Sequence, residues 1–398
     1  MKSNAIWLFA GGPMQASAAK NIKDDGFELI LTDMNPDSYC NKYADEFVEL
    51  DTFDIKGNLE QASDLQNKYE IKAVVTVAAD CHETVAHVAK YLQLFGISPE
   101  ISNICRQKHK TREVLADAGL FQPRFISVDN IHDARQFAND LNVPVVMKAT
   151  NNSGSRGFSF IESARDINED NFNLALKNGT SGKIIVEESL QPRGDIISEQ
   201  SVETLWHNGK MHWLNWVDRI FRSDLDLLGI NVDNYNNLGW AVELGHINPA
   251  VHDDEIKNNI KELIYLAGRA INFHEQKGAH ILKADIMLTG NGPVILELTP
   301  RLSGGWDSSG TTPARGADFI AGGIHIALSE KINEDVIKKY FTYQHDELFS
   351  SVVAEIKIGS TDNIGRKFSI STNKDRVESV IQAFNNLKRG IYVLPVEQ

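Results

Sequence analysis

Two acidic residues, Asp285 and Glu297, stand in neighbouring stretches of sequence that each alternate like a β-strand. The stretches are 280–288 (HILKADIML) and 293–299 (PVILELT), and a three-residue loop at 290–292 is expected to join them as a hairpin. In that register the two carboxylates face each other. Opposed carboxylates on a buried face repel each other and lose solvation, so we expect a cation between them. Such hard oxygen ligands suit Mg²⁺, whose coordination a substrate phosphate can complete.

The same hairpin predicts the neighbours of this acidic pair. Lys283 is expected opposite Thr299, and Ile295 is expected on the face that carries Glu297 and Thr299. Arg301 follows the second strand and opens a loop rich in serine and glycine. One alternative stays open: on a face exposed to solvent, the two acids need no cation.

Two further stretches could bind a nucleotide. Lys148 lies in the apolar strand 143–149 (VPVVMKA), and the loop 151–157 that follows carries two glycines among small polar residues. Backbone N–H groups of such a loop can surround phosphate oxygens, although a plain hairpin loop fits equally well. Glu187 and Glu188 end another apolar strand, where an acid can accept a hydrogen bond from an adenine amino group or can simply be solvated.

The elements that hold these residues begin with an alternation of strands and helices. Strands are expected at 5–10, 27–33 and 71–78, with helices at 14–26 and 81–96. Continuous apolar strands between helices predict a parallel sheet covered on both faces, a Rossmann-like unit. Its glycine turn, AGGPMQ, lacks the G-x-G-x-x-G fingerprint, so Asp33 is a weak candidate for binding a ribose.

Later elements mix both types. Ser98 and Pro99 predict a helix start, and Lys108 and Arg112 stand four residues apart on the next helix, a spacing typical of a solvated stripe. Asn208-Gly209 predicts the turn of a hairpin. The remaining expected elements are the helix 107–119, strands 157–162 and 183–190, the hairpin 201–221, an amphipathic helix at 253–271, strands 351–359, 365–371 and 391–395, and a helix at 375–387.

Composition limits the classes of function. The 398 residues suffice for two or three domains, and hydrophobic (42%) and charged (24%) fractions are ordinary for a globular protein. A net charge of −14 argues against nucleic acid as the main partner. Cys40, Cys81 and Cys105 lack metal-binding spacing and are expected to be free thiols. With no signal-peptide pattern and no apolar run near the roughly 18 residues of a membrane span, we expect a cytoplasmic protein.

The order of these features resembles the ATP-grasp superfamily over about residues 1 to 325, in particular its carbamoyl-phosphate-synthetase-like and amino-acid-ligase branch. The matching series is the αβ unit, LADAGLFQP, PVVMKAT, GSRG, VEESL, HNGK, KADIML and ELTPRLSGG. The resemblance implies an α/β and α+β multidomain fold. Its parts would be a Rossmann-like domain at 1–105, an ATP-grasp small lobe with the glycine-rich loop at 106–183, a large lobe with the metal site at 184–330, and a C-terminal α+β cap at 331–398.

The resemblance also implies roles for the residues that match its motifs. Asp285 and Glu297 would bind Mg²⁺ or Mn²⁺, and Arg301 would stabilise the transferring phosphoryl group as a catalytic residue. The family pattern E-x-N-P-R has Asn where this chain has Thr299, a shorter and weaker metal ligand. The ATP-binding set would be Lys108 and Lys148 (also catalytic) at the phosphates; Ser153, Gly154, Ser155, Arg156 and Gly157 over them; Glu187, Glu188 and Leu190 at adenine; and Asp195 at the ribose.

The activity implied is ATP-dependent joining of a carboxylate to an amine through an acyl phosphate, releasing ADP and phosphate. The partners would be small acids and amines of the amino-acid type, with neither nucleic acid nor a membrane, and a homodimer is left open. His82 and Glu83 follow a strand of the N-terminal sheet, where small ligands often bind. The candidate substrate residues are Arg219, Lys283, Ser303, Gly304 and Gly305, with Trp306 and Asp307 beside them, and a structural role fits each equally well.

Three other functions stay open. Bicarbonate activation, as in carboxylases or carbamoyl-phosphate formation, ranks lower because the sequence shows neither a biotin-carrier segment nor a glutaminase domain. A non-catalytic, ATP-binding regulatory protein is kept open by Thr299. A redox enzyme built on the N-terminal unit would lack the dinucleotide fingerprint.

Overall fold

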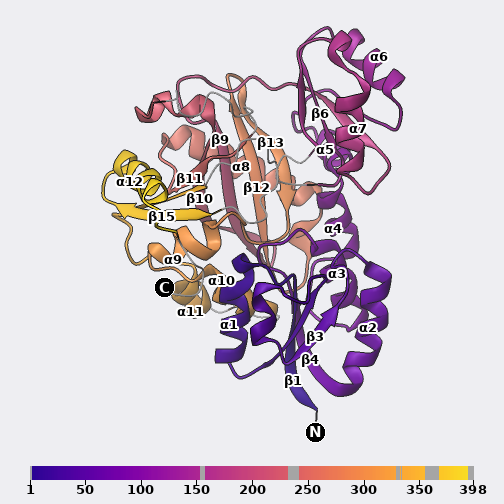
Figure 1. Cartoon of the computed structure of the whole chain (residues 1–398), viewed down its shortest axis with the longest axis vertical. Coiled ribbons are helices and arrows are strands. Elements are labelled where there is room, and N and C mark those ends of the chain that lie inside the picture. The colour runs from indigo at the N-terminus through magenta and orange to yellow at the C-terminus, as the bar shows by residue number, and fades with distance from the viewer. Residues whose placement is uncertain are drawn as a thin grey trace.

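The structure is a computed structural model that describes residues 2–152, 157–231, 242–328, 332, 334–354 and 367–392. Three sheets organise these residues: a parallel one near the N-terminus, a small antiparallel one and a large antiparallel one (Figure 1). Within the described part, no helix is long and apolar enough to cross a membrane. Cys40, Cys81 and Cys105 are buried free thiols, as expected.

The N-terminal domain, at the bottom of Figure 1, is the predicted parallel sheet. Its sheet order is β3 (Glu46–Glu49), β2 (Glu28–Asp33), β1 (Ser3–Phe9) and β4 (Tyr69–Val75). Alternate residues of β1 pack against α1 (Ala16–Asp24) on one face and against α2 (Ile55–Lys68) and α3 (His82–Tyr91) on the other. Asp33 accepts hydrogen bonds from the backbone N–H groups of Gly11 and Asn35, so its carboxylate closes the strand-to-helix turn.

The small lobe, at the upper right of Figure 1, has the sheet order β5-β8-β6-β7. Ser98 caps α4 as predicted, because its side chain accepts a hydrogen bond from the Ile101 N–H. β8 pairs with β5 and β6, so it lies in this sheet, beyond the boundary expected at residue 184. The elements of this lobe are β5 (Phe125–Val128), α6 (Ile131–Leu141), β6 (Val145–Ala149), β7 (Ser159–Ile161), α7 (Glu169–Lys177) and β8 (Ile184–Glu188). The helices α4 (Pro99–Arg106) and α5 (Lys108–Asp117) precede it and bury Ile101, Cys105 and Leu115 in the core of the large lobe.

The large lobe is built on an antiparallel sheet in the order β13-β12-β9-β10-β11-β14-β15. The β9–β10 turn is Asn208-Gly209, as predicted, and both residues have positive φ. Two strands that were expected in a separate C-terminal cap, β14 and β15, extend this sheet because β14 pairs with β11. The elements are β9 (Glu199–His207), β10 (Lys210–Ile220), β11 (Gly245–Asn248), α8 (Asp254–Ala270), β12 (Ala279–Thr289), β13 (Gly292–Thr299), α9 (Thr312–Ala314), α10 (Phe319–Ala327), α11 (Glu334–Tyr340), β14 (Phe349–Ala354), β15 (Phe368–Asn373) and α12 (Arg376–Lys388). The strand expected at 391–395 falls largely outside the described residues.

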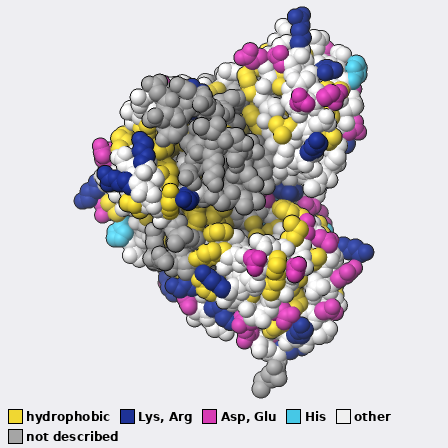
Figure 2. Space-filling view, viewed as in Figure 1, with side chains coloured by type: hydrophobic (Ala, Val, Ile, Leu, Met, Phe, Trp, Pro, Cys, Tyr) yellow, Lys and Arg dark blue, Asp and Glu magenta, His cyan; other side chains and the backbone are white. Residues whose placement is uncertain are grey.

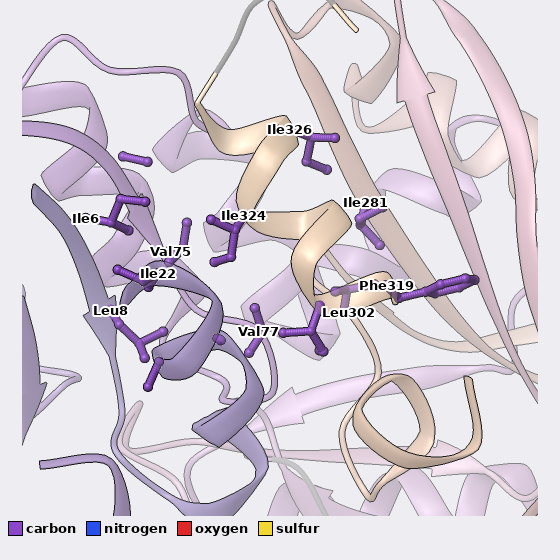
Figure 3. Packing of buried hydrophobic residues seen from close by; sticks show 14 of the residues in the cluster. Ile6, Leu8, Ile22, Val75, Val77, Ile281, Leu302, Phe319, Ile324 and Ile326 are labelled. Carbon is purple, nitrogen blue, oxygen red and sulfur yellow. The ribbon is translucent and has the colours of Figure 1, made fainter. Parts of the chain in front are cut away.

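The N-terminal domain and the large lobe share one hydrophobic core. Ile6, Leu8 and Val75 from the parallel sheet belong to one buried cluster with Ile281 of β12, and Ile324 of α10 lies between the two sides (Figure 3). The small lobe has a core of its own, formed by residues between 126 and 186. A notch separates the small lobe from the N-terminal domain on the right of Figure 2. The N-terminal domain is therefore packed against the large lobe but separated by the notch from the small lobe (Figure 2).

Candidate active site

Asp285 and Glu297 lie directly opposite each other on β12 and β13, as predicted, but the turn between the strands differs. Thr289 pairs with Gly292, so the loop has two residues instead of three. Such a loop alone would shift the register by one residue. A bulge at Leu296, between Ile295 and Glu297, restores the pairing of the two acids.

The bulge changes which residues share a face. Ile295 pairs with Ile286, and both belong to the core beneath α8, so the expectation that Ile295 shares a face with Glu297 was wrong. Lys283 pairs with Thr299 as expected, and Thr299 is buried. The bulge therefore lets β13 bury Ile295 on one side and keep Glu297 on the side of Asp285.

Cationic side chains surround the acidic pair. Lys283 Nζ lies 2.7 Å from Asp285 Oδ2, Arg219 Nη1 lies 3.4 Å from the same oxygen, and Lys108 Nζ lies 2.8 Å from Glu297 Oε1. Burial opposes ionisation of Asp285, but Lys283 and Arg219 outweigh it and lower its pKa. The pKa of Glu297 is lowered in the same way, mainly by Lys108 against burial. Both acids are therefore held ionised.

The pair fits a divalent cation. Asp285 Oδ1 is buried and has no hydrogen-bond partner among the described residues, an arrangement that costs free energy unless something binds there. No group of three or more His, Cys, Asp or Glu side chains in the described part could hold a metal by itself. Two carboxylates with an open remainder suit Mg²⁺, which keeps water or phosphate ligands.

Arg219, expected near the substrate, is fully engaged by carboxylates of its own lobe. Its guanidinium contacts Glu199 at 2.7 Å and Glu243 at 2.7 Å in addition to Asp285. Burial raises the pKa of Glu199 to about 7, despite the charge of Arg219. Arg219 therefore orders an acidic cluster beside Asp285 and Glu297, in which Glu199 and Glu243 were not predicted from the sequence.

The second group of predicted residues centres on Glu187 at the end of β8. Lys148 Nζ lies 2.5 Å from Glu187 Oε2, and Arg112 Nε lies 2.6 Å from Oε1. Burial raises the pKa of Glu187, but the charges of Arg112 and Lys148 outweigh it and lower the pKa to about 2. Glu187 is consequently a fixed anion at neutral pH.

The expectation that Arg112 belongs to a solvated stripe was wrong. It is buried rather than part of a solvated stripe, with its side chain 2% exposed. Besides Glu187, its guanidinium donates to Gln122 and to the carbonyl oxygens of Ile295 and Leu296 at the β13 bulge. Spacing alone could not reveal this, because the acceptors come from β8, from Gln122 and from the backbone of β13.

Other predicted nucleotide-binding residues are only partly visible. Ser153, Gly154, Ser155 and Arg156 lie outside the described residues. Gly157 has a φ of +75°, and a Cβ there would come within 2.8 Å of Asn178, so the end of the loop requires glycine. Lys108 Nζ also donates to the carbonyl oxygen of Asn152, near the start of the loop.

The predicted nucleotide-binding residues from Glu188, the last residue of β8, onward are less buried than Glu187. Glu188 forms two hydrogen bonds with Arg124, at 2.8 and 3.0 Å, and Leu190 is half-buried. Asp195, expected near a ribose, is exposed and pairs with Arg193. The structure thus brings Glu187 and Lys148 together, while the ribose role of Asp195 stays a prediction.

Arg301 joins the large lobe to the N-terminal domain. Its Nη2 donates to Asp80, its Nη1 donates to the Leu302 carbonyl at 2.7 Å, and its Nε has no partner among the described residues. The Gly305 N–H contacts Met14 Sδ at 3.2 Å, and a Cβ on Gly304 would lie 3.4 Å from the Ala78 carbonyl. The loop after β13 therefore lies against the turns of the N-terminal sheet.

A buried carboxylate that the sequence did not reveal, Glu203 on β9, anchors this loop. It accepts hydrogen bonds from the Ser303 N–H at 2.6 Å, the Ser308 hydroxyl at 2.7 Å and Asn215 at 3.0 Å. Asn215 also contacts Asp307. Burial, followed by the charge of Asp307, raises the pKa of Glu203 to about 7. Ser303 was expected near the substrate. Its backbone N–H helps to hold the loop in place by donating to Glu203.

Comparisons of sequence find distant relatives, and no family model matches the chain. An uncharacterised protein of Sinorhizobium fredii, y4rH, is 25% identical over 288 residues, which cover 72% of this chain and 55% of that protein. The arginine-specific large chain of carbamoyl phosphate synthase from Cutaneotrichosporon cutaneum is 23% identical over 207 residues, covering 49% of this chain and 16% of that protein. The chain thus spans about half the length of the first relative.

Solved structures resemble the chain along most of its length. L-amino acid ligase from Bacillus licheniformis superposes with a TM-score of 0.72 and 15% identity, covering 98% of both chains. N5-carboxyaminoimidazole synthetase from Staphylococcus aureus, complexed with ADP, gives a TM-score of 0.65 and 15% identity, covering 89% of this chain and 83% of that one. These neighbours are ATP-grasp ligases, so the fold that the sequence predicted is confirmed.

Proposed function

We propose that the chain is an ATP-dependent carboxylate–amine ligase that forms ADP and phosphate. The observation that carries this proposal is the acidic pair Asp285–Glu297, held ionised among Lys108, Lys283 and Arg219 on a fold shared with ATP-grasp ligases. Neighbours of this fold include an L-amino acid ligase and a synthetase complexed with ADP.

The proposed reaction has two steps. An oxygen of the substrate carboxylate forms a bond to the γ-phosphorus of ATP while the bond from that phosphorus to the β–γ bridging oxygen breaks, so ADP leaves. The nitrogen of an amine then attacks the carbonyl carbon of the acyl phosphate, loses a proton and expels phosphate. No side chain acts as a nucleophile in this scheme.

In this proposal the cationic residues bind phosphate groups, and the acidic residues bind the metal and the adenine. Lys108 and Lys148 would neutralise phosphate oxygens, and Arg301 would offset the charge that develops during transfer. Asp285 and Glu297 would hold Mg²⁺, which neutralises charge on the phosphate oxygens when bound. The anionic Glu187 would accept a hydrogen bond from the adenine amino group.

The test is an ADP-release assay with Mg²⁺ over a panel of amino acids and small acids, each with and without a second amine. Hydroxylamine added as the amine would trap an acyl phosphate as a hydroxamate. We expect ADP release that requires an acid, with Glu297→Gln reducing it at least about a hundredfold, while Glu255→Gln on the surface of α8 leaves it unchanged. Stimulation by bicarbonate alone would support a carboxylase instead, and tight ATP binding with no turnover would support a regulatory protein.

A further inference from the structure

A cavity lies where the N-terminal domain meets the large lobe. Its volume is about 110 Å³, and its wall is largely aliphatic, with Val75 and Val77 on one side and Ile281 and Ile326 on the other. For comparison, an apolar cavity of about 150 Å³ accommodates benzene. The space therefore suits a compact group such as a branched aliphatic side chain.

Two polar side chains in the wall of the same cavity each carry buried nitrogen atoms that have no hydrogen-bond partner among the described residues. His82 and Arg301 both belong to the wall. Neither ring nitrogen of His82 nor the Nε of Arg301 has a partner among the described residues, although all three atoms are buried. Buried polar groups are normally paired, so unused donors beside a cavity indicate that a ligand supplies the missing acceptor.

Arg301 connects this wall to the acidic pair, because it stands four residues after Glu297 and just past the end of β13. The charges of Asp80, Glu297 and Asp285 all act on Arg301. The charges of Asp80, Arg301 and Glu297 likewise act on His82, although burial dominates and lowers its pKa to about 3. His82 is thus a neutral ring with one donor and one acceptor.

The polar groups of Arg301 and His82 and the aliphatic wall together indicate which kind of ligand the cavity would bind. A carboxylate can accept from Arg301 and from a neutral His82, whereas an ammonium group with no carboxylate beside it would be repelled by Arg301. A charged side chain in the aliphatic part would lose its solvation without a partner. The ligand should therefore carry a carboxylate at one end and an apolar body at the other.

We propose that this cavity binds the apolar part of the carboxylate substrate, which makes the activated acid a compact, branched aliphatic carboxylate. This inference rests on the proposed ligase function. Both a branched-chain amino acid and the corresponding acid without an amino group have the required chemistry. The first would also offer an α-amino group, so the two sources can be separated by experiment.

The first experiment measures binding without nucleotide by calorimetric titration of the full chain. The probes are L-leucine and 4-methylpentanoate, with L-glutamate and acetate for comparison. We expect at least one of the first two to bind at least about tenfold more tightly than both comparison compounds, the difference of about 1.4 kcal/mol that burial of an aliphatic group can supply. Which of them binds more tightly identifies the source.

Two variants locate the binding. Ala327→Phe on the cavity wall should fill the space and weaken binding of the preferred probe at least about tenfold, whereas Ala116→Phe on the exposed side of α5 should not. His82→Gln should weaken it, whereas His87→Gln on the same helix should not. Affinity for an ATP analogue should stay unchanged in all four variants.

The outcomes separate this inference from the ligase proposal. Equal binding of L-glutamate, or unchanged binding in both Ala327→Phe and His82→Gln, would overturn the assignment of the cavity. ADP release stimulated only by polar acids would also overturn it while leaving a ligase. Cavity-dependent binding of L-leucine with no ADP release under any condition would instead overturn the ligase proposal and leave the binding site.

Discussion

At the scale of single residues, Thr299 is where this chain departs from the family it resembles. It lies next to Glu297 on β13, is buried, and pairs with Lys283 across the hairpin. Asn at this position would extend an amide oxygen further toward the two acids than the threonine hydroxyl reaches. The identity of residue 299 should therefore set how tightly the site binds Mg²⁺.

We expect Thr299→Asn to tighten Mg²⁺ binding about tenfold, and Thr299→Ala to leave it unchanged or weaker, because only the amide adds a strong oxygen ligand. The measurement is a Mg²⁺ titration in the presence of a non-hydrolysable ATP analogue. Thr372→Asn, at an exposed position of β15, is the matched control. Identical Mg²⁺ affinity in both variants and the natural chain would show that residue 299 is not a ligand.

Glu203 predicts a pH dependence of stability. Its pKa rises from the ordinary value of 4.5 to about 7 on folding, so between these pH values the folded state holds more protons than the unfolded state. The contribution of Glu203 to the free energy of unfolding should therefore be full at and below about pH 4.5 and fall as pH rises to 7, by up to about 3 kcal/mol.

The variant Glu203→Gln should lose this contribution, because an amide cannot ionise yet still accepts from Ser303 and Ser308. Urea unfolding between pH 5 and pH 8 should show the variant gaining stability over the natural chain as pH rises. Glu199, which also has a pKa of about 7, keeps a slope in both proteins, so the difference is the informative quantity. A constant difference across this range would contradict the prediction.

At the scale of elements, the sequence predicted the strands of the acidic hairpin because alternating residues report which face is buried. It could not predict the bulge at Leu296, since an extra leucine in an apolar strand looks like any other strand residue. The predicted turn was one residue too long, and the bulge was not predicted. These two errors offset each other for the pairing of Asp285 with Glu297, but they gave the wrong face for Ile295. The burial of Arg112 could not be predicted either, because its acceptors on β8 and β13 are far from it in the sequence.

Arg112 makes a prediction about the helix α5. It holds Glu187 on one side and the carbonyl groups of Ile295 and Leu296 at the bulge on the other, so it connects the residue proposed to bind adenine to the strand that carries Glu297. Arg112→Met should weaken binding of an ATP analogue at least about tenfold. It should also weaken Mg²⁺ binding, because the bulge that positions Glu297 loses its donor.

Calorimetry with the ATP analogue and Mg²⁺ tests this, with Arg165→Met at an exposed position as the control. Arg112→Lys should recover part of the nucleotide affinity, since the charge remains, but little of the Mg²⁺ affinity, since one ammonium group cannot span both partners. If Arg112→Met lowers only stability and leaves both affinities intact, Arg112 has a purely structural role.

At the scale of the whole molecule, the cores predict which parts unfold together. The N-terminal domain and the large lobe bury residues in one shared cluster, whereas the small lobe closes its cluster alone. A local loss of packing should therefore spread across the first junction and stop at the second. The same division would let the small lobe open and close over a nucleotide while Asp285 and Glu297 keep their positions.

Leu8→Ala and Ile184→Ala test this division with matched large-to-small changes at fully buried positions. Each should cost about 2–5 kcal/mol locally. In hydrogen exchange, Leu8→Ala should lower protection in β1 and also in β12 and α10, because Leu8 and Ile281 belong to one core. Ile184→Ala should lower protection only between residues 125 and 188. Equal loss of protection throughout the chain in both variants would mean that the three bodies unfold as one unit, and nucleotide entry would then need another source of motion than an independently opening small lobe.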